Sequence, residues 1–209
     1  MKTILVSACD TDAGKTFFTA ALARAHASKG ARVQIVKPLQ SGTVEDAVTA
    51  QRLTNCPTIE AFTLKIFHAP LGPLCAAQTE GKTIILKDLF EEIFVLPACD
   101  VRIIEGAGGL AVPLDIDGFD WADFAQVIEA DALALVVPDR LGAIHQARVC
   151  LSYAQKKYAG KIGIILNEVT PASDAGKQSN RTRLRDCGVP IWGTLAHDSL
   201  DLKIETSFL

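Results

Sequence analysis

The sequence predicts an α/β fold in which a parallel sheet is covered by helices on both faces. Short, continuous apolar runs recur along the chain, as expected of buried parallel strands. Stretches with helical patterns separate most of these runs, and strands that alternate with helices imply a parallel sheet. In such sheets ligands bind beyond the carboxyl ends of the strands, so we expect the site in the segments that follow them.

The expected elements can be placed along the chain as one domain over residues 1–209, a length that suits a single α/β unit. Strands are expected at residues 4–6, 33–36, 101–104, 132–137, 162–166 and 190–192. Helices are expected at 17–27, 86–94, 121–128, 144–158 and 181–187, with a short one near residue 46. Residues 55–82 carry several prolines and glycines between apolar residues, which predicts a loop-rich insertion lying on the sheet.

The first strand runs into a loop that is typical of phosphate binding. Gly14, Lys15 and Thr16 stand between this strand and an alanine-rich helix, the layout of a phosphate-binding loop. Gly14 lets the backbone approach an anion, Lys15 supplies a positive charge, and Thr16 can offer its hydroxyl to Mg²⁺. The strict pattern requires glycine where Cys9 stands, but the flanking strand and helix favour a nucleotide site over a simply capped helix. The fold class is therefore a P-loop-type parallel sheet.

The second strand is followed by Lys37 and Pro38, and Pro38 keeps Lys37 extended and prevents a helix from starting there. Lys37 should then lie at the carboxyl edge of the sheet, close to the phosphate loop. It either takes part in catalysis or substrate binding, or extends to solvent. Asp46 follows near a helix start, where it could be a metal ligand or only a partner of the helix dipole; Glu45 is the substitute if the register differs by one.

The third strand ends in Glu105, which is followed by the glycine-rich turn Gly106-Ala107-Gly108-Gly109. A carboxylate at a buried strand end resembles a Walker-B-like arrangement, which can hold Mg²⁺ directly or through water. Glycine N–H groups could face a phosphate, and so many glycines imply close approach of the backbone to something. The alternative is a solvated acid before a flexible turn.

Two later strand ends carry weaker signals. The fourth leads through Leu141, Gly142, Ala143 and Ile144 to His145 at a helix start, a potential anion site, although such a histidine is more often a surface or capping residue. The fifth ends in Asn167, whose amide both donates and accepts and could read an adenine edge; turn initiation is the alternative.

Composition narrows the possible partners and the compartment. A net charge of −3 argues against a general nucleic-acid or anionic-membrane partner. The six cysteines lack Cys-x-x-Cys spacing, so neither a zinc site nor a dithiol redox motif is indicated. No apolar stretch approaches the roughly 20 residues that span a bilayer, and acidic residues interrupt the first apolar run too early for a signal peptide. We therefore expect a cytoplasmic protein with no membrane partner.

Taken together, these motifs resemble the dethiobiotin synthase family, enzymes that close the ureido ring in biotin synthesis using ATP. The resemblance holds from the N-terminus to about residue 171. It rests on five segments: Asp10-Thr11-Asp12-Ala13-Gly14-Lys15-Thr16, Lys37-Pro38-Leu39-Gln40-Ser41-Gly42, Glu105-Gly106-Ala107-Gly108-Gly109, Leu141-Gly142-Ala143-Ile144 and Asn167-Glu168-Val169-Thr170-Pro171. The second and third segments, in this order, are the most specific. Ala8, Cys9, Leu74 and His145 stand where the family usually carries glycine, threonine, histidine and asparagine.

The resemblance implies a reaction in which 7,8-diaminopelargonate takes up CO₂ as a carbamate. ATP phosphorylates the carbamate, and the second amine then attacks the mixed anhydride, giving dethiobiotin, ADP and phosphate. Lys15 would hold the phosphates, and Lys37 would stabilise the carbamate and the transferring phosphoryl group. Thr16, Asp46 and Glu105 would hold Mg²⁺.

The same resemblance assigns the remaining contacts and a homodimer. Thr11 and Ser41 would position the diamine and its carbamate, while Leu141 to His145 of one subunit would grip the substrate carboxylate at the other. The ATP-binding set would comprise Asp12, Ala13, Gly14, Lys15, Thr16, Phe17, Asp46, Glu105, Gly106, Ala107, Gly108, Asn167, Glu168, Ala196, His197 and Asp198.

Two other readings remain open. A dimeric P-loop ATPase switch of the partitioning or nitrogenase-iron-protein type is one, but those proteins carry a lysine where this chain has Asp10. The other is a nucleotide-binding protein that kept the fold and lost or altered catalysis.

Overall fold

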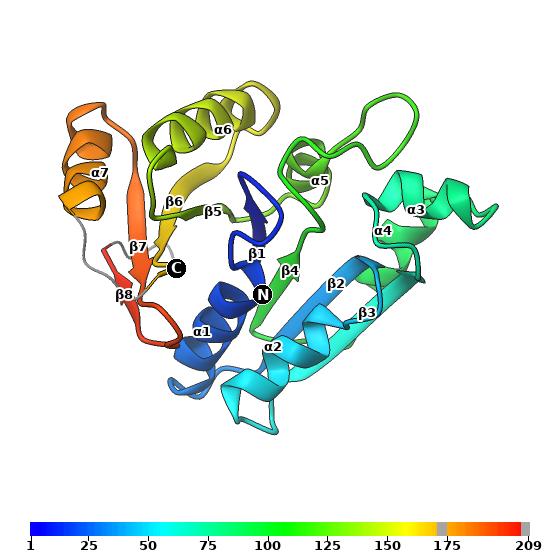
Figure 1. Ribbon diagram of the computed structural model, residues 1–209. Helices are drawn as coiled ribbons and strands as arrows, with labels where there is room; N and C mark the ends of the chain where they lie inside the picture. The colour runs from blue at the N-terminus through cyan, green and yellow to red at the C-terminus, as the bar shows by residue number, and fades with distance from the viewer. Residues whose placement is uncertain (171–174, 206–209) are drawn as a thin grey trace.

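A computed structural model of the protein describes residues 1–170 and 175–205, and within these ranges eight strands form one sheet. The strands lie side by side in the order β3-β2-β4-β1-β5-β6-β7-β8, and neighbours are parallel except β7 and β8 (Figure 1). Their bounds are β1 (Lys2–Ala8), β2 (Val33–Ser41), β3 (Glu60–Phe67), β4 (Val101–Glu105), β5 (Ala132–Pro138), β6 (Lys161–Asn167), β7 (Ile191–Leu195) and β8 (Leu202–Ile204).

Helices cover both faces of this sheet, as predicted (Figure 1). On one face α1 and α2 bury an apolar layer against the strands that includes Phe18, Ile4 and Ile35. The other helices pack on the opposite face, where Trp121 and Phe124 are fully buried. The bounds are α1 (Lys15–Ala27), α2 (Asp46–Thr54), α3 (Pro73–Thr79), α4 (Leu86–Phe94), α5 (Trp121–Val127), α6 (Ala143–Lys157) and α7 (Ala175–Asp186).

All six predicted strands and the predicted helices are present, but the interpretation of residues 55–82 as a loop-rich insertion was wrong. This segment contains β3, which forms one edge of the sheet, and α3. β3 is only partly buried along its length, so it lacks the continuous apolar run by which the central strands were recognised. The short antiparallel strand β8 was missed as well, and α7 begins earlier than expected, at Ala175.

The second strand is longer than predicted, which changes the position of Lys37. β2 continues to Ser41, so Lys37 lies within the strand and not beyond its end. Pro38 is tolerated there because β2 pairs with β4 only as far as Val36 opposite Ile104. The next step of this parallel register brings Lys37 beside Glu105, the last residue of β4. The sheet itself therefore places these two charged side chains together.

In the described ranges, no helix is long and apolar enough to cross a membrane. All six cysteines are free thiols, in agreement with their scattered spacing.

Candidate active site

The loop between β1 and α1 has the backbone of an anion-binding loop. Gly14 precedes α1 with φ +92°, a left-handed conformation that favours glycine, and Asp12 also has a positive φ of 55°. No side chain among the described residues caps α1, so the first N–H groups of the helix can face an anion. Lys15 is buried, and its Nζ donates a hydrogen bond to the Asp10 carbonyl at 3.2 Å.

Asn167, at the end of β6, packs directly against this loop. Its Nδ2 donates a hydrogen bond to the Ala13 carbonyl at 2.9 Å, and a Cβ added to Gly14 would lie 2.0 Å from Nδ2. Gly14 therefore serves two needs, the left-handed turn and the close approach of Asn167. Cys9, which replaces the expected glycine, is half-buried, and burial raises the pKa of its thiol to about 12. The thiol stays neutral and acts as a small apolar group.

Lys37 lies at the centre of a buried charge cluster. Its Nζ is 2.6 Å from Asp46 Oδ2 and 3.0 Å from Glu105 Oε1, and it donates a hydrogen bond to the Gly106 carbonyl at 3.0 Å. The Lys37 and Glu105 side chains are almost completely buried, whereas that of Asp46 is 28% exposed. The cost of burying an ammonium is thus met by two carboxylates, and the alternative in which Lys37 extends to solvent is excluded by its burial.

The two lysines are close enough to affect each other's protonation. Burial and the positive charge of Lys37 lower the pKa of Lys15 from its ordinary value. Burial would also lower the pKa of Lys37, but the carboxylates of Glu105 and Asp46 outweigh it and hold the pKa above its ordinary value. The two carboxylates therefore favour the charged form of Lys37.

Glu105 has one oxygen that is satisfied and one that is not. Oε1 accepts hydrogen bonds from Lys37 Nζ and from Thr16 Oγ1, each at 3.0 Å. Oε2 is buried and has no hydrogen-bond partner among the described residues. A buried carboxylate oxygen without a partner is costly, and a hard cation would satisfy it.

The oxygen donors of Thr16, Asp46 and Glu105 fit Mg²⁺, which prefers carboxylate, hydroxyl, water and phosphate oxygens. Among the described residues no group of three His, Cys, Asp or Glu side chains could hold a metal by itself. Two carboxylates and a hydroxyl suit a cation that completes its coordination with water and with the phosphates of a nucleotide.

The glycine-rich turn after β4 is held against β1. The N–H groups of Gly106 and Leu110 donate hydrogen bonds to the carbonyls of Val6 at 2.9 Å and Ala8 at 2.8 Å. Trp121 Nε1 donates to the Ala107 carbonyl at 2.8 Å, and its ring lies 3.0 Å from the position of a Cβ on Gly106. A Cβ on Gly108 would instead lie 3.0 Å from Val112, so the close approach that the glycines implied is to the side chains of Trp121 and Val112.

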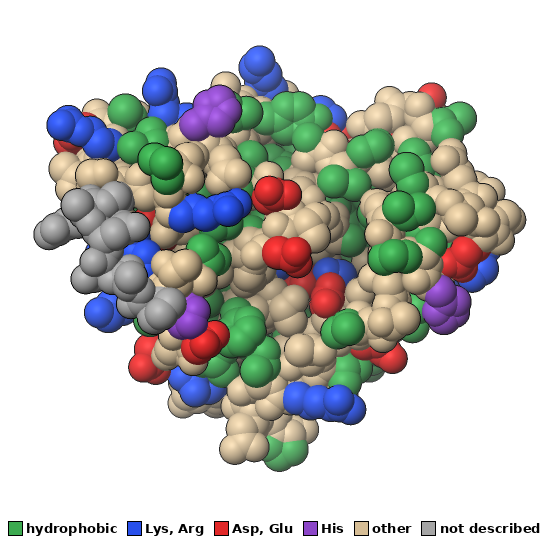
Figure 2. Space-filling model, viewed as in Figure 1, with side chains coloured by type: hydrophobic (Ala, Val, Ile, Leu, Met, Phe, Trp, Pro, Cys, Tyr) green, Lys and Arg blue, Asp and Glu red, His purple; other side chains and the backbone are tan. Residues whose placement is uncertain are grey.

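These groups open into one cleft of about 850 Å³ at the carboxyl ends of β1, β2 and β4. Figure 2 shows acidic and basic side chains gathered near the middle of this face. The walls include Thr11, Asp12, Phe17 and Ser41 from the predicted set. The Oγ of Ser41 is buried, and the part of the chain that the structure describes offers it no hydrogen-bond partner. An apolar part of the lining is formed by Pro70, Leu71, Pro73 and Val112.

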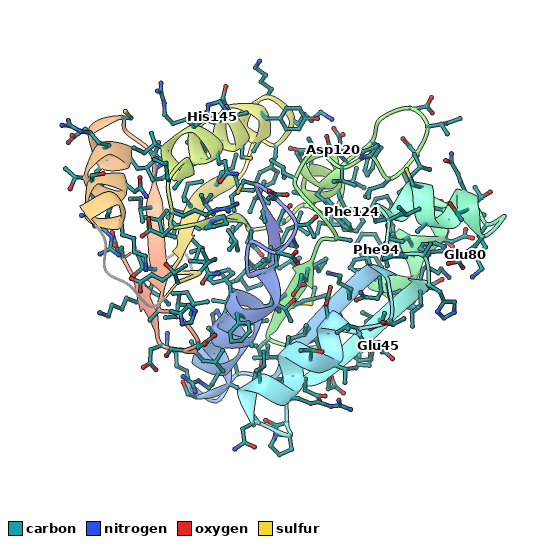
Figure 3. The ribbon with its side chains drawn as sticks, in the orientation of Figure 1. Glu45, Glu80, Phe94, Asp120, Phe124 and His145 are labelled. Carbon is teal, nitrogen blue, oxygen red and sulfur yellow. The ribbon has the colours of Figure 1, made fainter. Side chains whose placement is uncertain are left out.

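Other predicted residues lie outside this cleft. Leu141 is 97% exposed, and His145 lies on α6, on the far side of the molecule from Glu45 at the start of α2 (Figure 3). Glu168, Ala196, His197 and Asp198 follow β6 and β7 at the same edge of the sheet as the cleft but are not part of its lining. Pro171 of the fifth motif lies outside the described residues.

Three structural contributions were not predicted from sequence. Trp121 supports the glycine turn, Val112 completes the apolar wall, and the Gln40 side chain accepts a hydrogen bond from the Asp46 N–H. Gln40 stands inside the Lys37 to Gly42 motif, which was the only sequence signal for its importance. The contacts of Trp121 and Val112 join segments distant in sequence and leave no local pattern.

The fold and the phosphate-binding loop define a P-loop nucleotide-binding protein, and residues 2–200 match a family model described as an AAA domain. The chain is 33% identical over 203 residues to the ATP-dependent dethiobiotin synthetase BioD of Bacillus licheniformis, covering 92% of this chain and 85% of that protein. It is 35% identical over 208 residues to the protein of the same name from Corynebacterium efficiens, covering 97% and 92%.

The chain belongs to the ATP-dependent dethiobiotin synthetase family, a family of ATP-using ligases. A solved structure of a putative plasmid partition protein from Borrelia burgdorferi, bound to AMPPNP, is similar with a TM-score of 0.61. At 11% identity, with 99% of this chain and 92% of that chain covered, this likeness supports the fold alone.

Proposed function

We propose that the protein catalyses the ATP-dependent carboxylation and ring closure of 7,8-diaminopelargonate with CO₂, giving dethiobiotin, ADP and phosphate. The observation that carries the proposal is the convergence of Lys15 and Lys37 on one cleft, beside the carboxylates of Asp46 and Glu105. Both the carbamate and the γ-phosphate are anions, so their reaction requires positive charge placed between them.

The phosphate-binding loop would hold the triphosphate. Lys15 starts α1, and its ammonium donates a hydrogen bond to the Asp10 carbonyl at 3.2 Å, an interaction that a phosphate oxygen can replace. Asp12, Ala13, Phe17 and the turn from Gly106 to Gly108 complete the proposed phosphate contacts. Thr16, Asp46 and Glu105 would hold Mg²⁺, which when bound neutralises the charge that develops on the phosphate oxygens.

Lys37 would act on the carbamate. Its ammonium has three N–H donors and three contacts, so the carbamate or the phosphoryl group would replace one contact while the other two keep the ammonium in place. The carbamate oxygen attacks the γ-phosphorus and ADP leaves; the second amine then attacks the carbamoyl carbon, and phosphate leaves as the ring closes. Thr11 and Ser41, which both line the cleft, would orient the diamine and its carbamate.

For adenine we propose Asn167 and Glu168 with the residues 196–198. Asn167 Nδ2 is already committed to the Ala13 carbonyl, so its Oδ1 would be the group that accepts a hydrogen bond from the adenine amino group.

We also propose a homodimer in which residues 141–145 of one subunit hold the substrate carboxylate at the other. The near-complete exposure of Leu141 and the basic residues His145 and Arg148, which line a surface hollow on α6, support this arrangement.

Product analysis tests the proposed function. ADP should form only when diaminopelargonate and bicarbonate are both present, and label from bicarbonate should enter the organic product. ATP hydrolysis that is independent of the diamine would overturn the proposal and favour a P-loop ATPase switch. Nucleotide binding without turnover under any combination would favour a protein that has lost catalysis.

A further inference from the structure

The start of α2 lacks the cap that its own sequence would normally provide. The N-cap residue, Glu45, has an extended backbone and makes no side-chain cap hydrogen bond. The first N–H groups of a helix have no partner within the helix, so another group must satisfy them. Here the Oε1 of Gln40, from the end of β2, accepts the hydrogen bond of the Asp46 N–H at 3.0 Å.

Both ends of the Gln40 amide are used inside the protein. Its Nε2 donates to the Ser41 carbonyl at 2.9 Å, and the residue is 4% exposed. A backbone N–H requires an oxygen opposite it and a carbonyl requires a nitrogen, so the two partners fix the orientation of the amide. The side chain therefore forms a rigid link from β2 to the first residue of α2.

This link joins the two residues whose charges meet in the cleft. Lys37 lies three residues before Gln40 on the same strand, and its Nζ contacts the Asp46 carboxylate at 2.6 Å. The connecting residues 42–45 are largely exposed, so they constrain Asp46 only weakly. We propose that Gln40 is a positioning residue, which holds the Asp46 carboxylate at the distance from Lys37 and Glu105 that a bound Mg²⁺ requires.

The inference rests on the proposed function, because it takes Asp46 as a magnesium ligand. Mg²⁺ demands near-ideal octahedral geometry, and partners that orient a ligating carboxylate typically contribute about 10-fold to 100-fold to metal affinity. The effect of Gln40 should therefore appear in the magnesium dependence of nucleotide binding and not in nucleotide binding without metal.

The test uses Gln40→Met, which keeps the length of the side chain and removes both polar groups. We expect the Mg²⁺ concentration for half-maximal binding of a non-hydrolysable ATP analogue, measured by calorimetry, to rise about 10-fold to 100-fold. Gln40→Glu keeps an oxygen for the Asp46 N–H but turns its second oxygen toward the Ser41 carbonyl, so it should recover part of the affinity that Gln40→Met loses. If Gln40→Met does not fold, Gln40→Asn, whose amide is too short to reach Asp46, takes its place.

Gln51→Met is the matched control, because Gln51 Nε2 ties the other end of α2 to the Ile59 carbonyl. It should lower the melting temperature without changing the magnesium titration. An unchanged titration in Gln40→Met, an equal shift in Gln51→Met, or no rescue by Gln40→Glu would each overturn the inference.

Asp46→Asn separates this inference from the proposed metal site. It should shift the titration at least as far as Gln40→Met, and no shift in Asp46→Asn would remove Asp46 from the metal site and overturn both proposals. A wild-type protein that makes no product from the diamine would overturn the proposed reaction alone, since the binding titration needs neither diamine nor bicarbonate.

Discussion

Replacing Lys37 with methionine should affect catalysis and stability through separate mechanisms. The substitution keeps the unbranched stem and removes the ammonium, which has two carboxylates and a carbonyl within 3.0 Å and is 2% exposed. Loss of one preorganised charged donor at a developing anion typically costs about 10²-fold to 10³-fold in turnover. Binding of ATP should persist, since Lys15 and the loop backbone are untouched.

The stability cost follows from the carboxylates that are left behind. Removing one partner of a buried ion pair costs about 3–5 kcal/mol, because the remaining charge is buried without compensation. Lys65→Met is the control, since the Lys65–Glu92 pair is roughly 40% exposed on both sides (44% and 38%); such surface pairs contribute less than about 1 kcal/mol. Combining Lys37→Met with Asp46→Asn should recover part of the lost stability but none of the turnover.

Urea unfolding and steady-state ADP formation measure the two effects. A loss of unfolding free energy no larger than that of Lys65→Met would refute the argument that Lys37 is the compensating charge of the cluster. Near-normal turnover with the diamine would remove Lys37 from the mechanism, whatever the stability result.

Three further outcomes are expected. Glu105→Gln should weaken magnesium-dependent nucleotide binding, since it removes the charge beside the unpartnered Oε2; an unchanged Mg²⁺ titration would assign that ligand elsewhere. Gly14→Ala should abolish nucleotide binding, because a Cβ would lie 2.0 Å from Asn167 Nδ2 and φ is +92°; retained affinity in a filter-binding assay would contradict this. In Glu80, hydrogen bonds from Lys82 and from backbone N–H groups lower the carboxyl pKa from 4.5 to about 2. The stability from Glu80 is therefore complete above about pH 5 and is lost as the pH falls toward 2, so the melting-temperature gap between wild type and Glu80→Gln should close over that range. A melting-temperature gap that stays constant over this pH range would show that the negative charge of Glu80 is not what stabilises the wild type.

Much of the architecture follows from local sequence, because central parallel strands are buried on both faces and leave apolar runs. The edge strand β3 was not recognised because its half-exposed residues give no such run, and prolines on either side suggested a loop. The extension of β2 through Pro38 was missed because proline normally excludes a ladder position, and sequence alone did not reveal that β4 ends before it.

The candidate site, like the fold, has a part that local sequence predicts and a part that it does not. Lys15, Thr16, Lys37 and Glu105 could be proposed from sequence because each comes directly after an apolar run or its loop and carries a charge or a hydroxyl suited to phosphate or metal. The arrangement of Asp46 depends on the Gln40 amide, and the shape of the glycine turn depends on Trp121. Such contacts depend on how elements pack in space, which periodicity and spacing do not specify.

The unequal lengths of β2 and β4 have a consequence for how the site can change. β2 has nine residues and β4 has five, so the sheet opens into a notch where β4 ends and β2 continues, paired with β3. The breadth of this notch is set by main-chain ladders on either side and not by the residues that line it. Side chains that line the notch can therefore be exchanged to accept other substrates. The main-chain frame, which sets the separation between the proposed carbamate and γ-phosphate positions, keeps its dimensions.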